Sequence, residues 1–133
     1  MDVILRVCKA RKVSAYTTYC TVLTAWAESR LRSNARSAEP VSASGYYSEG
    51  VFQQTLPWWK NNHWDVEASC NAFLDNFRAN NTDPVKDCWD VQRWNAPDYR
   101  RDLNGFLASK ETKNYLDCAA DIEEMINTRK VPR

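Results

Sequence analysis

The stretch from Val13 to Ala27 carries no charged side chain, although 26% of the residues in the chain are charged. Ser14 stands near its start, where a helix N-cap is expected, and apolar residues follow at helical spacing. A helix that faces water normally shows charges on its outer side, so one without them must be covered on most sides. We therefore predict a central helix from Ser14 to Leu31 or Arg32. Its apolar face consists of Tyr16, Cys20, Leu23, Ala27 and Leu31.

Apolar residues at helical spacing elsewhere predict further helices around this one. The chain holds only 3 glycines, which disfavours a fold built from strands and tight turns. The expected fold class is all-α, mainly helical, with about six helices in total. The other predicted helices are residues 3–10 with Asp2 as cap, one capped by Asp65 and closed by Asn80 and Asn81, one capped by Thr82 or Asp83, one opened by Pro97, and one from about Thr112.

A long irregular segment separates the central helix from the later ones. Residues 33–50 are rich in Ser, Ala, Asn and Pro and show no periodicity, and residues 50–59 are too interrupted by Pro57 for a regular helix. Long ordered loops in compact domains are more often functional than not. We expect this segment to form an active-site loop.

Length and charge limit the classes of protein. The 133 residues suffice for one domain, which we expect to span residues 1–133. Because 18 Lys and Arg against 17 Asp and Glu leave a net charge of +1, nothing favours nucleic acid or a membrane surface as a partner. No run approaches the roughly 20 apolar residues of a membrane span, and the first residues are no signal peptide.

Five cysteines, Cys8, Cys20, Cys70, Cys88 and Cys118, are an odd number without a CxxC pair. Each falls at an apolar position of a predicted helix, so we expect buried free thiols. The spacing does not suit zinc, and we expect no metal and no cofactor. A cysteine peptidase pair of Cys70 and His63 is an alternative that no motif supports.

Two features point to chemistry on a glycan. Glu28 is the first charge after the uncharged stretch, and partial removal from water would favour the protonated form that a general acid needs. The alternative is a surface pair of Glu28 with Arg32. Aromatic residues could stack on sugar rings or simply fill the core. They are Tyr46, Tyr47, Phe52, Trp58, Trp59 and Trp64.

Two motifs together resemble a known family. Residues 25–31 (AWAESRL) are followed by residues 48–54 (SEGVFQQ). This pair is similar to the ES helix and Gln-containing glycine turn of lytic transglycosylases and goose-type lysozymes, within the lysozyme-like superfamily. The nearest likeness is to actinobacteriophage endolysins and actinobacterial cell-wall proteins. It covers roughly residues 3–110, including segments 83–93 and 96–99.

The resemblance implies a lysozyme-like fold in which Glu28 is the general acid. It also implies that Gly50, Gln53 and Gln54 line the glycan cleft, and that Ser48 donates a hydrogen bond there. Tyr47 precedes the turn and Tyr99 is expected to approach the cleft from a later helix.

The second catalytic group is less defined, because Thr55 and Leu56 stand where goose-type lysozymes have an Asp. Glu49 is the nearest candidate, with Glu39 behind it. Inverting hydrolysis needs a second carboxylate roughly 6.5–9.5 Å from the acid to activate water. Lytic transglycosylases, as the resemblance implies, need only one Glu. We favour hydrolysis with Glu28 and Glu49 as the catalytic pair, because a carboxylate inside the motif is easier to explain by use than by accident.

The expected function is cleavage of the β-1,4 bond between N-acetylmuramic acid and N-acetylglucosamine in bacterial peptidoglycan. A phage endolysin domain made in the host cytoplasm and acting on the cell wall fits the lack of a signal peptide. Met1 directly before a helix suggests excision from a longer lysin whose other domains would be partners. The alternative class is a non-catalytic module that binds cell-wall glycan.

Overall fold

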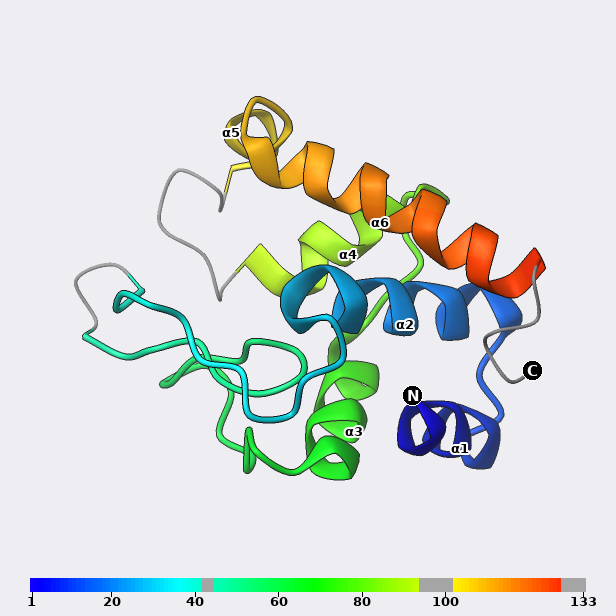
Figure 1. Ribbon diagram of the computed structural model, residues 1–133, viewed down its shortest axis with the longest axis horizontal. Coiled ribbons are helices and arrows are strands. Elements are labelled where there is room, and N and C mark those ends of the chain that lie inside the picture. The colour runs from blue at the N-terminus through cyan, green and yellow to red at the C-terminus, as the bar shows by residue number, and fades with distance from the viewer. Residues whose placement is uncertain (42–44, 94–101, 128–133) are drawn as a thin grey trace.

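The computed structural model describes residues 1–41, 45–93 and 102–127. Within those ranges the chain is mainly helical and contains no extended sheet, which confirms the all-α prediction (Figure 1). The helices are α1 (Asp2–Ala10), α2 (Ala15–Ser29), α3 (Val66–Asn76), α4 (Pro84–Gln92), α5 (Leu103–Leu107) and α6 (Lys110–Asn127). None of the helices in the described part has the length and apolar character needed to cross a membrane.

Helix α2 lies at the centre of the fold, as its lack of charge predicts. All side chains from Cys20 to Ala25 are buried, so the helix is covered around its circumference. It packs against α6 on one side and against α4, α1 and α3 on the others (Figure 1). The buried hydroxyls of Thr21 and Thr24 donate to the carbonyls one turn earlier, at 2.7 and 2.9 Å, so their polar atoms are satisfied inside the core.

Three of the predicted N-caps are present. Ser14 accepts from the Thr17 amide at 3.1 Å, and Asp65 accepts from the Ala68 amide at 2.9 Å. Asp83, rather than Thr82, caps α4 and accepts from the Val85 amide at 3.0 Å. Each side chain satisfies a helix N–H group that has no partner within its own helix.

Two boundaries near the start of the chain differ from the prediction. Asp2 lies in the first turn of α1 and makes no capping hydrogen bond, because the helix starts one residue earlier with Met1 as its cap. Helix α2 ends at Ser29 because Arg30 and Leu31 both adopt positive φ angles, of 55° and 64°. Their amides bond back to Trp26 and Ala25, a C-terminal cap that turns the chain sharply. The helical i,i+4 pair of Glu28 with Arg32 is therefore ruled out.

Later boundaries also shift. Helix α3 ends at Asn76 rather than at Asn80 and Asn81, because the backbone of Phe77 is extended while its ring stacks on Phe73 at 5.6 Å. Helix α6 begins at Lys110, two residues before the predicted Thr112. Pro97 lies outside the described residues, and the next described helix, α5, is capped by Asp102.

The segment between α2 and α3 is irregular, as predicted, and part of its backbone is paired within the segment. Glu49 forms isolated antiparallel bridges with Arg36 on one side and Gln54 on the other. The segment is anchored to the core by Phe52, which is fully buried and stacks on Phe73 at 4.9 Å. This anchoring holds the irregular chain beside the C-terminal end of α2 (Figure 1).

The five cysteines are free and buried, which confirms their predicted role as core residues. We expect the denatured chain to titrate with five reactive thiols under non-reducing conditions, and the native chain to react slowly because its thiols are covered. Ellman's reagent with and without denaturant measures both values. Fewer than five thiols in the denatured chain would demonstrate a disulfide and contradict this structure.

A buried carboxylate connects α2, α4 and the loop between α3 and α4. Asp87 is 0% exposed and accepts hydrogen bonds from the Tyr16 hydroxyl and from the backbone and side-chain nitrogens of Asn81, the latter two at 2.9 Å. Burial and the bond to Asp87 raise the pKa of Tyr16 above its ordinary value of 10.0.

Removing the Tyr16 hydroxyl should therefore destabilise the fold. We expect Tyr16→Phe to lower the free energy of unfolding by about 1–3 kcal/mol at neutral pH, because a buried carboxylate loses a donor. The folded pKa of Tyr16 is raised, so the parent should lose stability as pH rises above 10, and the variant should lose less. Urea titrations at several pH values test this, with Tyr19→Phe on the same helix as a control for loss of a hydroxyl at neutral pH only, because burial raises the pKa of Tyr19 as well. Equal losses from both variants would contradict it.

Candidate functional site

A pocket of about 330 Å³ opens beside the C-terminal end of α2. Its walls come from α2, the irregular segment, the end of α4 and the start of α6. We call it the Glu28 pocket. Its lining residues are Ala27, Glu28, Ser37, Glu39, Pro40, Val41, Ser48, Gln53, Gln92 and Glu111. Hydroxyl, amide and carboxylate groups dominate this wall, a composition suited to a ligand with many hydroxyl groups.

Glu28 lies in the last turn of α2 and is partly buried. Its Oε1 atom accepts a hydrogen bond from the Tyr115 hydroxyl at 2.6 Å. Tyr115 is 1% exposed and belongs to α6, so its ring is fixed by core packing and in turn fixes the carboxyl group. No sequence motif points to this contact, because it depends on how α6 packs on α2.

Residues 48–55, here called the 48–55 turn, contribute Ser48 and Gln53 to the pocket wall. The Ser37 amide donates to the Ser48 carbonyl at 2.9 Å, and the Ser48 amide donates to the Ser37 hydroxyl at 3.0 Å. Ser48 also shares a hydrogen bond of 2.9 Å with the Thr55 hydroxyl. The Gln53 side-chain nitrogen donates to the carbonyls of Ala35 and Gly50 at 3.1 and 3.0 Å. These bonds make the wall ordered although it has no regular secondary structure.

The structure brings together Glu28, Ser48 and Gln53, three of the residues that the motif comparison selected. Gly50 instead has a backbone role. Its φ is +80°, and a Cβ atom there would lie 1.8 Å from the His63 carbonyl oxygen, so only glycine fits. The Arg36 guanidinium lies over the ring of Tyr47, with its central carbon 3.8 Å from the ring centre. Tyr99 lies outside the described residues.

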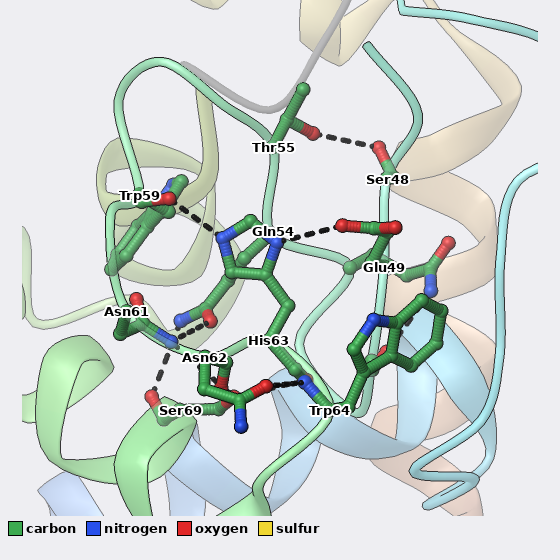
Figure 2. A network of polar contacts seen from close by, with 12 residues as sticks. Ser48, Glu49, Gln54, Thr55, Trp59, Asn61, Asn62, His63, Trp64 and Ser69 are labelled. Atoms are coloured by element: carbon green, nitrogen blue, oxygen red, sulfur yellow. Dashed lines mark hydrogen bonds and ion pairs between the residues drawn. The ribbon is translucent and has the colours of Figure 1, made fainter.

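Gln54 is fully buried and belongs to a different network (Figure 2). Its side-chain nitrogen donates to the Ser69 carbonyl at 3.2 Å, and its oxygen accepts from the Asn61 side chain at 2.7 Å. These bonds tie the 48–55 turn to α3. Gln54 does not line the Glu28 pocket, so the expectation that it contacts a glycan there is not supported.

Glu49 is also directed away from the pocket lining. Its Oε1 atom lies 3.0 Å from Nδ1 of His63, and the other ring nitrogen of His63 lies 2.6 Å from the Trp59 carbonyl (Figure 2). Cys70 contacts the Cys8 thiol, and this contact and burial raise the pKa of Cys70. His63 and Cys70 therefore serve separate contacts, and the arrangement does not support a peptidase pair.

Two carboxylates that share the pocket with Glu28 had little or no support in the sequence. Glu39 and Glu111 come from the irregular segment and from the first turn of α6. Gln92 completes the wall, and its side-chain nitrogen donates to the Phe52 carbonyl at 2.7 Å. Only the packing of α4 and α6 brings Gln92 and Glu111 to this position, so no local motif could have identified them.

The aromatic residues divide between core and surface. Phe52 and Trp59 are buried, whereas Tyr46, Trp58 and Trp64 are 46%, 40% and 45% exposed. Burial therefore assigns Phe52 and Trp59 to the core, whereas Tyr46, Trp58 and Trp64 lie at the surface.

Among the residues that the structure describes, no three His, Cys, Asp or Glu side chains converge in a way that could hold a metal ion. Comparison with known proteins gave no match to a protein-family model, to a curated protein or to a solved structure.

Proposed function

We propose that this chain cleaves the β-1,4 glycosidic bond between N-acetylmuramic acid and N-acetylglucosamine in bacterial peptidoglycan, with Glu28 as general acid. The observation that carries this proposal is the shared pocket. Glu28 from the ES motif and Ser48 and Gln53 from the glycine turn line one cavity, although they are distant in the sequence. Glycoside cleavage needs a general acid at the scissile bond, and the hydroxyl and amide groups beside Glu28 are suited to binding a sugar.

Each group has a definite part in the proposed reaction. Glu28 protonates the leaving oxygen, and its bond to Tyr115 keeps the carboxyl group in one orientation. The Gln53 nitrogen is held by two backbone carbonyls, so its amide oxygen is the atom offered to a sugar hydroxyl or acetamido N–H. Ser48 lines the same space. Exposed Trp58 and Trp64 on the irregular segment are suited to stacking on further sugars.

We further propose a lysozyme-like fold and an origin in a phage endolysin that acts on the cell wall. The buried central helix that ends just after the ES motif supports the first point. The likeness of residues 25–31 and 48–54 to actinobacteriophage lysins supports the second. Peptidoglycan is then the partner of the Glu28 pocket.

Hydrolysis needs a second carboxylate to activate water, and Glu39 and Glu111 are better placed for this than Glu49. Both line the pocket with Glu28, whereas Glu49 is engaged by His63. We favour hydrolysis because the pocket contains these additional carboxylates. Transglycosylation would require neither of them, since the muramic acid 6-hydroxyl attacks within the substrate.

Replacing Glu28 by Gln tests the acid directly. The variant should fold like the parent, and its rate of wall lysis should fall on the order of 10²–10⁴-fold because no proton reaches the leaving oxygen. Turbidity of a cell-wall suspension gives the rate, and thermal unfolding verifies the fold. Glu67→Gln, at an exposed carboxylate on α3, is the matched control and should retain parental activity.

Activity near the parental level in folded Glu28→Gln would remove Glu28 from the acid role. A parent chain that binds glycan without cleaving it would instead support the non-catalytic module.

Glu39→Gln and Glu111→Gln identify the second carboxylate. If one of them activates water, that variant should lose about 10²-fold or more in rate, and the parent should release reducing ends of inverted configuration. Mass spectrometry of the products distinguishes reducing from anhydro ends. Anhydro products together with full activity in both variants would show that the enzyme is a transglycosylase.

A further inference from the structure

Glu49 and His63 form a contact that the proposed reaction does not use. His63 is 5% exposed, the Glu49 side chain is 27% exposed, and both lie just behind the pocket wall formed by Ser48 and Gln53. We propose that the Glu49–His63 pair is a positioning device that holds the 48–55 turn in its ligand-binding shape, and that Glu49 takes no part in bond cleavage. The expected effect of this pair on activity rests on the proposed function, whereas its expected effect on the structure of the turn does not.

The hydrogen-bond geometry shows what the contact requires. Nε2 of His63 lies 2.6 Å from the Trp59 carbonyl, which can only accept, so Nε2 carries a proton. Nδ1 lies 3.0 Å from a carboxyl oxygen of Glu49, and a proton must lie between these two atoms as well. The contact therefore consists of an imidazolium with a carboxylate, or of a neutral ring that accepts from a protonated Glu49. In both forms a hydrogen bond joins the pair, and in the first form it is charge-assisted and therefore stronger than one between neutral groups.

His63 is itself fixed to the helical core (Figure 2). Its backbone carbonyl accepts from the Ser69 hydroxyl of α3 at 3.2 Å, and the same carbonyl fills the space where Gly50 lacks a side chain. The 48–55 turn therefore rests on His63 through its backbone and is joined to it through Glu49. Movement of the turn away from α3 would have to break the Glu49–His63 contact.

The backbone of Glu49 shows how this anchor reaches the pocket. Its amide donates to the Gln54 carbonyl at 2.9 Å, and the Gln54 amide donates back to Glu49 at 2.9 Å. The next amide, of Gly50, donates to the Ala35 carbonyl at 2.8 Å, and that carbonyl also accepts from the Gln53 side chain. Loss of the anchor should therefore loosen the residues that present Ser48 and Gln53 to a ligand.

Substitutions of Glu49 separate positioning from chemistry. In Glu49→Gln the amide can donate to Nδ1 while Nε2–H still donates to Trp59, so a neutral pair satisfies every group. Glu49→Ala removes the partner altogether, and Glu49→Asp keeps the charge but shortens its reach. A catalytic carboxylate would be lost in both the Gln and the Ala variant, whereas a positioning residue is rescued by Gln.

Two measurements are needed on the parent, the three variants and Glu67→Ala as a control for loss of one exposed negative charge. Amide hydrogen exchange at Glu49, Gly50 and Gln54 reports the turn without reference to activity. For Glu49→Ala we expect exchange there to rise roughly tenfold or more, since a tenfold change corresponds to loss of about one buried hydrogen bond. Steady-state kinetics on solubilised peptidoglycan should show that KM rises more than kcat falls.

Glu49→Gln should match the parent within about threefold in both measurements, because its hydrogen bonds are retained. Glu49→Asp should give exchange rates and KM values between those of the Gln and Ala variants. It replaces the Ala variant in the comparison if that variant does not fold. Unchanged exchange in Glu49→Ala or Glu49→Asp would overturn the proposal, as would a loss of kcat in Glu49→Gln equal to that in Glu49→Ala. If the parent cleaves no peptidoglycan, the proposed function fails while the exchange data still decide the role of the pair.

Discussion

Burial of the uncharged helix α2 is the constraint on which the other elements depend. Every side chain from Cys20 to Ala25 is covered, so helices must pack on all sides of α2, and α1, α3, α4 and α6 do so. The helix can stay buried only where its side chains are apolar or where their polar groups have hydrogen-bond partners. Glu28 enters at its last turn, where the cap at Arg30 turns the chain outward, and it therefore lies at the edge of the core instead of inside it. This position leaves a carboxyl group partly removed from water yet accessible from the Glu28 pocket.

The wall that faces Glu28 follows a different principle. An irregular chain cannot satisfy its backbone groups through a helix or sheet, so the segment between α2 and α3 uses its own polar side chains for this purpose. The Ser37 and Gln53 side chains bond to neighbouring backbone groups, the Ser48 hydroxyl bonds to that of Thr55, and Gln54 connects the turn to α3. Several residues that look suited to a sugar in the sequence are thus also structural, and Gln54 is structural alone. Under the proposed function, the sugar would contact those atoms of the pocket lining that take no part in this internal bonding.

The carboxylates near the pocket look alike in the sequence but have different surroundings. Glu28, Glu39 and Glu111 line the cavity, while Glu49, which the motif places closest to the turn, contacts His63. The difference arises because adjacent residues in an extended turn point to opposite sides. Ser48 lines the pocket, and Glu49 is directed to the other side, toward His63. The pairing of Glu49 with a buried histidine is what makes a positioning role more consistent with the geometry than a catalytic one.

The sequence by itself predicted the helical class, the central position of α2, the caps at Ser14 and Asp65 and the burial of the five thiols, and it selected Glu28, Ser48 and Gln53 as candidate residues. For α4 it left the cap open between Thr82 and Asp83. These features follow from local periodicity, capping and motif spacing, which act over a few residues. Only the tertiary structure decided that Tyr115 contacts Glu28, that Glu111 and Gln92 enter the pocket, and that Glu49 turns toward His63. Those contacts depend on how helices distant in the sequence pack against one another, and no short-range pattern encodes the direction in which a side chain meets a partner from another element.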